Sequence, residues 1–133
     1  MNGNIEKIDQ KKAFLQSYQA LIVSIKTLGN LLTRLEEEQI QLFSILSRFS
    51  GTGQVDKEIS DICSYLREQL REKNEICKKI VKNVSQMDSE IEKDILLLKY
   101  ISGYTWEEIS EMTNYSLRQV YNIHNHALNH FSM

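Results

Sequence analysis

Residues 88–133, DSEIEKDILLLKYISGYTWEEISEMTNYSLRQVYNIHNHALNHFSM, decide the fold because three helix-start signals follow one another there. Each signal is a hydroxyl residue with Glu or Gln three positions later: Ser89 with Glu92, Thr105 with Glu108, and Ser116 with Gln119. In such a capping box the two side chains satisfy backbone N–H groups at the start of a helix. The sequence therefore predicts helices over 90–101, 106–113 and 117–131. Gly103 and Asn114 lie between them and tolerate a left-handed backbone.

Apolar residues recur at helical spacing in each of these three segments, which predicts one small three-helix core. They are Ile91, Ile95, Leu98 and Ile101, then Trp106, Ile109 and Met112, then Val120, Ile123, Ala127 and Phe131. A short helix, a turn at Asn114 and a longer helix make a helix-turn-helix, with the small Ser110 where the helices cross. A hairpin of two helices that only packs would show the same pattern. The outward face of the last helix therefore has to distinguish a helix-turn-helix from such a hairpin.

That outward face carries Arg118, Asn122, Asn125 and Asn129 at steps of four, three and four. Arg can pair bidentately with guanine and Asn with adenine in the major groove of DNA. Asn is also a poor helix former, so three of them on one stripe weaken the helix without a packing reason. The stripe favours a DNA-reading helix over a packing hairpin.

Residues 96–131 resemble region 4 of the sigma-70 family and related sigma-like helix-turn-helix domains. The matching positions are Gly103, Thr105, Trp106 to Ser110, Ser116, Val120, Ile123, Ala127 and Leu128. The resemblance implies that Leu117, Arg118, Tyr121 and Asn122 face the DNA. With the neighbouring polar positions, the candidate DNA-binding residues are Ser116, Leu117, Arg118, Gln119, Tyr121, Asn122 and Asn125. A short chain with a coiled-coil front and a sigma-like end also resembles small phage-encoded transcriptional regulators of the RinA and ArpU type.

The charge of this region departs from the family pattern, which usually places several arginines on the last helix. Residues 88–133 hold three basic and seven acidic side chains, a net charge of −4, which disfavours phosphate binding. Either a second copy and the basic helix before this region supply affinity, or the region binds a protein such as RNA polymerase.

The chain before residue 88 predicts two long helices. Apolar positions from Tyr18 to Phe49 alternate steps of three and four, and so do those from Ile59 to Met87. The segment 50–56, which contains Gly51 and Gly53, predicts a turn between the two long helices. We therefore expect a helical hairpin or coiled coil over 1–87 that makes a homo-oligomer, in the simplest case a dimer, and a DNA-binding domain over 88–133.

Composition agrees with an all-α protein, because the 133 residues include no proline and only five glycines. This length excludes a large multidomain enzyme, and the net charge of −2 excludes a polybasic binder. Cys63 and Cys77 would lie about 21 Å apart on one helix, too far for a disulfide, so we expect two small buried side chains.

No nucleophile with a nearby base, phosphate loop or carboxylate pair is visible, so we expect no catalysis and no cofactor. His126 and His130 share a helical face, but no cysteine or carboxylate lies near them in sequence, so no metal is expected. Protonation of the histidines could add positive charge at the end of the helix. No signal peptide or bilayer-spanning run is present, which predicts a cytoplasmic, nucleoid-associated protein.

Together these features predict a long helical hairpin or coiled coil followed by a three-helix, sigma-like helix-turn-helix domain. The expected function is that of a phage-encoded, sequence-specific transcriptional regulator that binds double-stranded DNA. The alternative is a protein-interaction module that docks on RNA polymerase or on another regulator without reading DNA.

Overall fold

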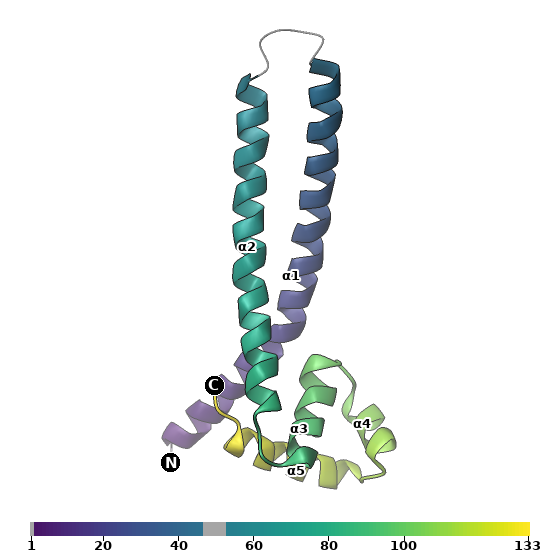
Figure 1. Ribbon diagram of the computed structural model, residues 1–133. Helices are drawn as coiled ribbons and strands as arrows, with labels where there is room; N and C mark the ends of the chain where they lie inside the picture. The colour runs from purple at the N-terminus through teal and green to yellow at the C-terminus, as the bar shows by residue number, and fades with distance from the viewer. Residues whose placement is uncertain (1, 47–52) are drawn as a thin grey trace. The chain divides into compact units, whose positions relative to one another are not determined.

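The computed structural model describes residues 2–46 and 53–133, and this part of the chain is helical without a strand. Its elements are α1 (Asn2–Leu46), α2 (Gly53–Ser85), α3 (Glu90–Leu96), the π-helical turn η1 (Leu97–Ile101), α4 (Trp106–Thr113) and α5 (Leu117–His130). Figure 1 labels α1 to α5. The predicted all-α class is confirmed. None of the helices in the described residues combines the length and the apolar character that a membrane crossing requires.

The chain forms two compact units, and their boundaries differ from the expected division at residue 88. One unit, called here the terminal unit, joins Met1–Leu21 to Ile76–Met133, and the other, the middle unit, is Ile22–Glu75. The difference arises because Leu15, Ile80 and Val84 are fully buried in one core with residues of α5. Both ends of the predicted hairpin therefore belong to the terminal unit.

The first core of the terminal unit is built around the N-terminal part of α1. Its buried members are Leu15, Ile80, Val84, Leu96, Tyr100, Ala127, Leu128 and Phe131. The Nζ of Lys11 donates to the carbonyl oxygens of Leu128 at 2.9 Å and Asn129 at 3.3 Å, near the end of α5. The Nε2 of Gln19 donates to the carbonyl oxygens of Tyr100 at 3.2 Å and Ile101 at 2.7 Å, at the end of η1. Side chains from the first five turns of α1 thus donate hydrogen bonds to carbonyl groups at the ends of α5 and η1, which have no partner within their own helix.

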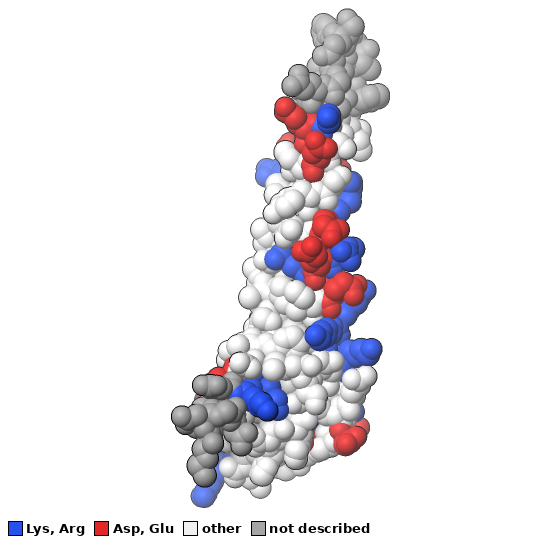
Figure 2. All heavy atoms as spheres, turned by 90° about the vertical axis from the view of Figure 1, so that its left-hand side faces the viewer, with Lys and Arg blue, Asp and Glu red and all other residues white. Residues whose placement is uncertain are grey.

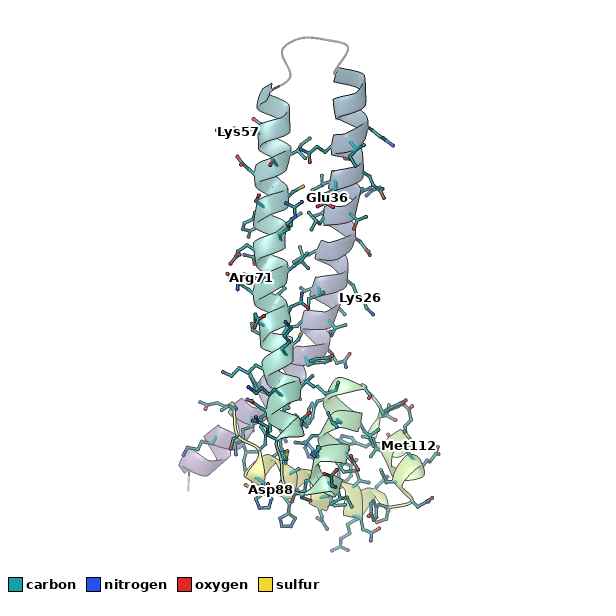
Figure 3. All side chains as sticks on the ribbon, in the orientation of Figure 1. Lys26, Glu36, Lys57, Arg71, Asp88 and Met112 are labelled. Carbon is teal, nitrogen blue, oxygen red and sulfur yellow. The ribbon has the colours of Figure 1, made fainter. Side chains whose placement is uncertain are left out.

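The second core of the terminal unit joins α3, α4 and α5 through Ile95, Ile109 and Val120, all fully buried. Two residues predicted to be buried are exposed instead, Ile91 and Met112, the latter with 53% of its surface accessible. Ile91 precedes the buried Glu92 and Met112 precedes the half-buried Thr113, and each is turned by about 100° from that neighbour, because successive residues of a helix turn by that angle. Met112 accordingly points away from α4 in Figure 3.

The predicted helix over 90–101 changes its winding at residue 97. The N–H of Ser102 donates to the carbonyl of Leu97 at 2.8 Å, a bond that spans five residues. Gly103 follows with φ 79°, a left-handed conformation as the sequence predicted. A wider helical turn of this kind is rare and inserts one extra residue, which reorients the side chains that follow.

In the middle unit, α1 is continuous through Gly29 and Asn30, and its seam residues from Ile25 to Leu35 are half-buried. Cys63 and Leu66 of α2 are buried, whereas Ile62 is exposed, contrary to the predicted seam. An ion pair between Arg67 and Glu36 joins the two antiparallel helices. In Figure 3, Glu36 lies on the side of α1 that faces α2.

The predicted turn at 50–56 falls partly on residues 47–52, which lie outside the described residues. Residues 53–56 form the first turn of α2. Cys63 and Cys77 are free and buried, as predicted, and burial raises the pKa of the Cys77 thiol.

Candidate functional site

The connection between α4 and α5 is held by side chains that bond to the backbone. Asn114 ends α4 in the left-handed conformation, with φ 60°, as predicted. The hydroxyl of Ser110 donates to the carbonyl of Tyr115 at 2.5 Å, and the hydroxyl of Thr113 donates to the carbonyl of Ile109 at 2.7 Å. These bonds fix the angle at which the chain leaves one helix and enters the next.

Both predicted capping boxes of this region are present. The N–H of Gln119 donates to Oγ of Ser116 at 3.2 Å, and the N–H of Ser116 donates to Oε1 of Gln119 at 2.9 Å. Thr105 and Glu108 form the corresponding pair at the start of α4. The third predicted box is only half formed, because Ser89 accepts from the N–H of Glu92 while the Glu92 carboxylate turns to His130.

The inner side of α5 packs firmly against the terminal unit. Val120, His124, Ala127 and Leu128 are buried along the helix, and Phe131 is buried just after it. The other side is therefore fixed in direction, because a helix anchored at four positions cannot rotate about its axis.

The seven candidate residues separate into two groups on α5. The side chains of Ser116 and Gln119 form the hydrogen bonds of the helix cap. The ring of Tyr121 lies 5.3 Å from that of Trp106 in an edge-on contact. Leu117, Arg118, Asn122 and Asn125 are exposed, and so is Asn129. Among the described residues, Arg118, Asn122 and Asn125 have no side-chain partner in the protein.

His124 is a buried residue, a role that sequence reasoning did not assign to it. It is 5% exposed, and its Nε2 lies 2.7 Å from the hydroxyl of Tyr100 in a hydrogen bond. Burial, together with the charges of Lys12 and Lys99, lowers the pKa of His124 to about 4, and burial raises the pKa of Tyr100 to about 12. His124 is therefore neutral near pH 7, and the expected positive charge does not arise at this position. The sequence does contain a signal for this burial, because His124 lies four residues after Val120 and three before Ala127 and so shares their helix face.

Trp106 connects α5 to η1. Its ring lies 4.6 Å from the ring of His124, and the ammonium of Lys99 sits 4.6 Å from the centroid of the indole. Lys99 lies within the π-helical turn, and Gly103 with its left-handed backbone stands between it and Trp106, so no local spacing pattern predicts this contact.

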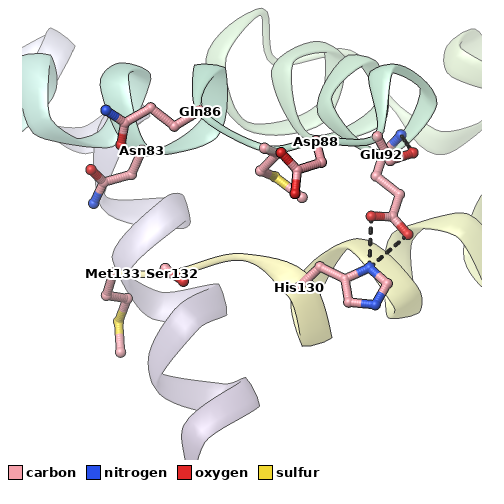
Figure 4. A pocket seen from close by; sticks show the side chains of 9 residues that line it. Asn83, Gln86, Asp88, Glu92, His130, Ser132 and Met133 are labelled. Carbon is pink, nitrogen blue, oxygen red and sulfur yellow. Dashed lines mark hydrogen bonds and ion pairs between the residues drawn. The ribbon is translucent and has the colours of Figure 1, made fainter.

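A hollow of about 750 Å³ lies beside the end of α5, and Asn83, Gln86, Asp88, Ser132 and Met133 are among the residues that line it (Figure 4). In it the carboxylate oxygens of Glu92 lie 2.8 and 3.0 Å from Nδ1 of His130. The structure thus brings to His130 a carboxylate that is distant in sequence. Among the described residues, however, no three His, Cys, Asp or Glu side chains gather as metal ligands would.

The charge around α5 is more balanced than residues 88–133 alone indicate. The terminal unit also contains Lys78, Lys79 and Lys82 of α2, and Met1–Leu21 contributes three basic and two acidic residues. With these added, the unit has nine basic and nine acidic side chains and a net charge of zero. On the face in Figure 2, basic and acidic side chains interleave along the long helices without forming a continuous basic surface.

Comparisons with known proteins found no protein-family model, no curated protein and no solved structure that matches the chain. What the chain can do must therefore be inferred from the geometry of α4 and α5 and from the chemistry of the side chains that α5 exposes. These side chains are one guanidinium and several carboxamides, which can donate and accept hydrogen bonds in one plane.

Proposed function

We propose that this protein is a sequence-specific DNA-binding transcriptional regulator that reads double-stranded DNA with the exposed side of α5. The observation that carries the proposal is the stripe of Arg118, Asn122 and Asn125, exposed and without side-chain partners among the described residues, on a helix whose opposite side is buried. A packing helix has no use for such a stripe, whereas the edges of guanine and adenine match these groups. The resemblance of residues 96–131 to sigma-like helix-turn-helix domains supports the same role, in a phage-encoded regulator that acts at the nucleoid.

Affinity for the backbone needs positive charge, and the terminal unit carries it outside residues 88–133. Lys79 and Lys82 are exposed on the last part of α2, which contains no acidic residue from 76 to 85. Self-association would add the lysines of a second copy and would place two reading helices on one duplex. We propose a homodimer that forms through the seams of α1 and α2.

A second candidate function is a protein-interaction module that docks on RNA polymerase or another regulator. The observation that favours it is the outer side of α4, where Glu107 and Glu111 are exposed beside the apolar Met112. An acidic surface with an apolar centre fits a basic protein surface better than it fits DNA.

Selection from a random pool of duplex DNA distinguishes the two functions. Duplexes would be selected from a random pool on the full chain, and the dissociation constant of the enriched sequence would be measured at about 50 and about 200 mM salt. The first function predicts an enriched sequence whose binding weakens steeply with salt, because phosphate contacts release counterions. Failure to enrich any duplex, together with binding to RNA polymerase, would establish the second function instead.

A further inference from the structure

Lys99 is a cation positioned by an aromatic ring, and it has no acidic partner in the part of the chain that the structure describes. Its ammonium lies over the Trp106 indole, 4.6 Å from the ring centroid, and the residue is half-buried. No described carboxylate forms an ion pair with it, although seven acidic residues lie between 88 and 133; Lys93, by contrast, pairs with Glu90 at 3.0 Å. The positive charge of Lys99 is therefore locally uncompensated, and the indole limits the positions that the ammonium can take.

The ring contacts of Trp106 place this cation at the border of the exposed side of α5. Trp106 touches Tyr121 edge-on at 5.3 Å, and 42% of the surface of Tyr121 is exposed. Tyr121 precedes Asn122, so its ring lies on the flank of the stripe between the buried side and the exposed side of the helix. The ring of His124 of α5 lies 4.6 Å from that of Trp106, so the cation over the indole is close to this helix.

We propose that Lys99 binds a phosphate of the DNA backbone beside the base contacts of Arg118 and Asn122. This inference rests on the proposed function and adds to it a residue outside α4 and α5. Phosphate contacts set the register of a protein on the duplex, whereas base contacts select the sequence. A lysine serves such a contact as a point charge, and its contact with Trp106 positions that charge before DNA arrives.

The test measures how the dissociation constant of the enriched duplex depends on salt for the full chain and three variants. Lys99→Met keeps the apolar stem over Trp106 and removes the charge, so the slope of log affinity against log salt should fall by about 0.9, the contribution of one phosphate. Binding to an unrelated duplex should weaken by the same factor. Lys99→Arg should keep the slope of the parent. Lys26→Met, an exposed lysine of the middle unit (Figure 3), is the matched control and should also keep it.

A second measurement uses the fluorescence of Trp106, the single tryptophan of the chain. DNA should change this emission in the parent and less in Lys99→Met, whereas inorganic phosphate at the same ionic strength should leave it unchanged. An unchanged salt slope in Lys99→Met, with its unfolding midpoint retained, would overturn the assignment of Lys99 while leaving the proposed function intact. Absence of salt-dependent DNA binding by the parent would overturn both.

Discussion

Among the described residues of the terminal unit, His124 and Glu92 are buried polar side chains, and each has a different partner. His124 shares a hydrogen bond with Tyr100 and meets the ring of Trp106 edge-on, so the neutral imidazole has partners without carrying a charge. Glu92 keeps a carboxylate beside His130 at the end of α5. Buried polar groups are tolerated only with such partners, because an unpaired one costs free energy.

The lowered pKa of His124 predicts that acid destabilises the fold. Between pH 6.5 and about 4 the unfolded chain binds a proton at this residue and the folded chain does not. The free energy of unfolding should therefore fall as the pH drops through this range, by at most about 3 kcal/mol from this residue.

Denaturant titrations at pH 7 and pH 4.5 would measure the effect. His124→Gln offers Tyr100 a hydrogen-bond partner that does not titrate, so its loss of stability between the two pH values should be smaller than that of the parent. His126→Gln, at an exposed position of the same helix, should retain the decline of the parent. An equal loss of stability between pH 7 and pH 4.5 in all three proteins would contradict the assignment of this pH dependence to His124.

At the scale of the helix, α5 is held at both ends by groups that complement its backbone. Ser116 and Gln119 cap the start, and Lys11 donates to the carbonyls of Leu128 and Asn129 near the end. The cation at the last turn also faces the negative end of the helix dipole.

Replacing the cap should destabilise the terminal unit by a predictable amount. Ser116→Ala removes the acceptor for the N–H of Gln119 and should lower the free energy of unfolding by about 1 kcal/mol. Ser116→Asp, which retains a capping oxygen, should stay close to the parent. Ser60→Ala, at an exposed position inside α2, is the control, and a loss there as large as in Ser116→Ala would argue against a capping role.

Helix starts and turns could be predicted from the sequence because capping and left-handed residues act over a few positions. Thr105, Asn114 and Ser116 all do what their local patterns indicate. The contacts of Lys11 and Gln19 could not be predicted, because they join segments that lie more than 80 residues apart. No local signal in the sequence marks the change to π-helical winding at Leu97. Of the candidate site, the exposed stripe followed from helical spacing, whereas the contact of Lys99 with Trp106 did not.

The terminal unit is assembled from both ends of the chain, so its core is incomplete without either end. Leu15 is 0% exposed, and with Lys11 and Gln19 it fills and closes the core that Phe131 and Leu128 share. A fragment of residues 88–133 lacks this side of the core as well as Ile80 and Val84.

We therefore predict that residues 88–133 alone do not fold cooperatively, and that deleting residues 2–21 from the full chain also removes the cooperative transition of α5. Removing a fully buried leucine alone costs about 2–5 kcal/mol, which is comparable with the stability of a small domain. Thermal unfolding followed by amide dispersion in NMR spectra would measure this. A sharp transition and dispersed spectra in the 88–133 fragment would contradict the prediction.

The middle unit leads to a prediction about assembly. Leu28, Leu32 and Leu35 of α1 are only half-buried in the single chain, although they belong to a regular heptad seam. We predict a dimer at micromolar concentration, which sedimentation equilibrium would detect. Replacing Leu28 and Leu35 with Glu should yield a monomer with the α5 signals unchanged. A single 15.6 kDa species in the parent would contradict the proposed homodimer.

The central claim, that α5 reads DNA bases, is tested most directly by the affinity of Arg118→Ala and Asn122→Ala for the enriched duplex. Both side chains are exposed and without partners among the described residues, so the unfolding midpoint should stay near that of the parent. Each variant should lose about 1–3 kcal/mol of specific binding if its side chain pairs with a base. Arg34→Ala and Asn74→Ala, exposed in the middle unit, are the matched controls and should bind as the parent does. If Arg118→Ala and Asn122→Ala also bind the enriched duplex as tightly as the parent, α5 does not read DNA and the central claim is wrong.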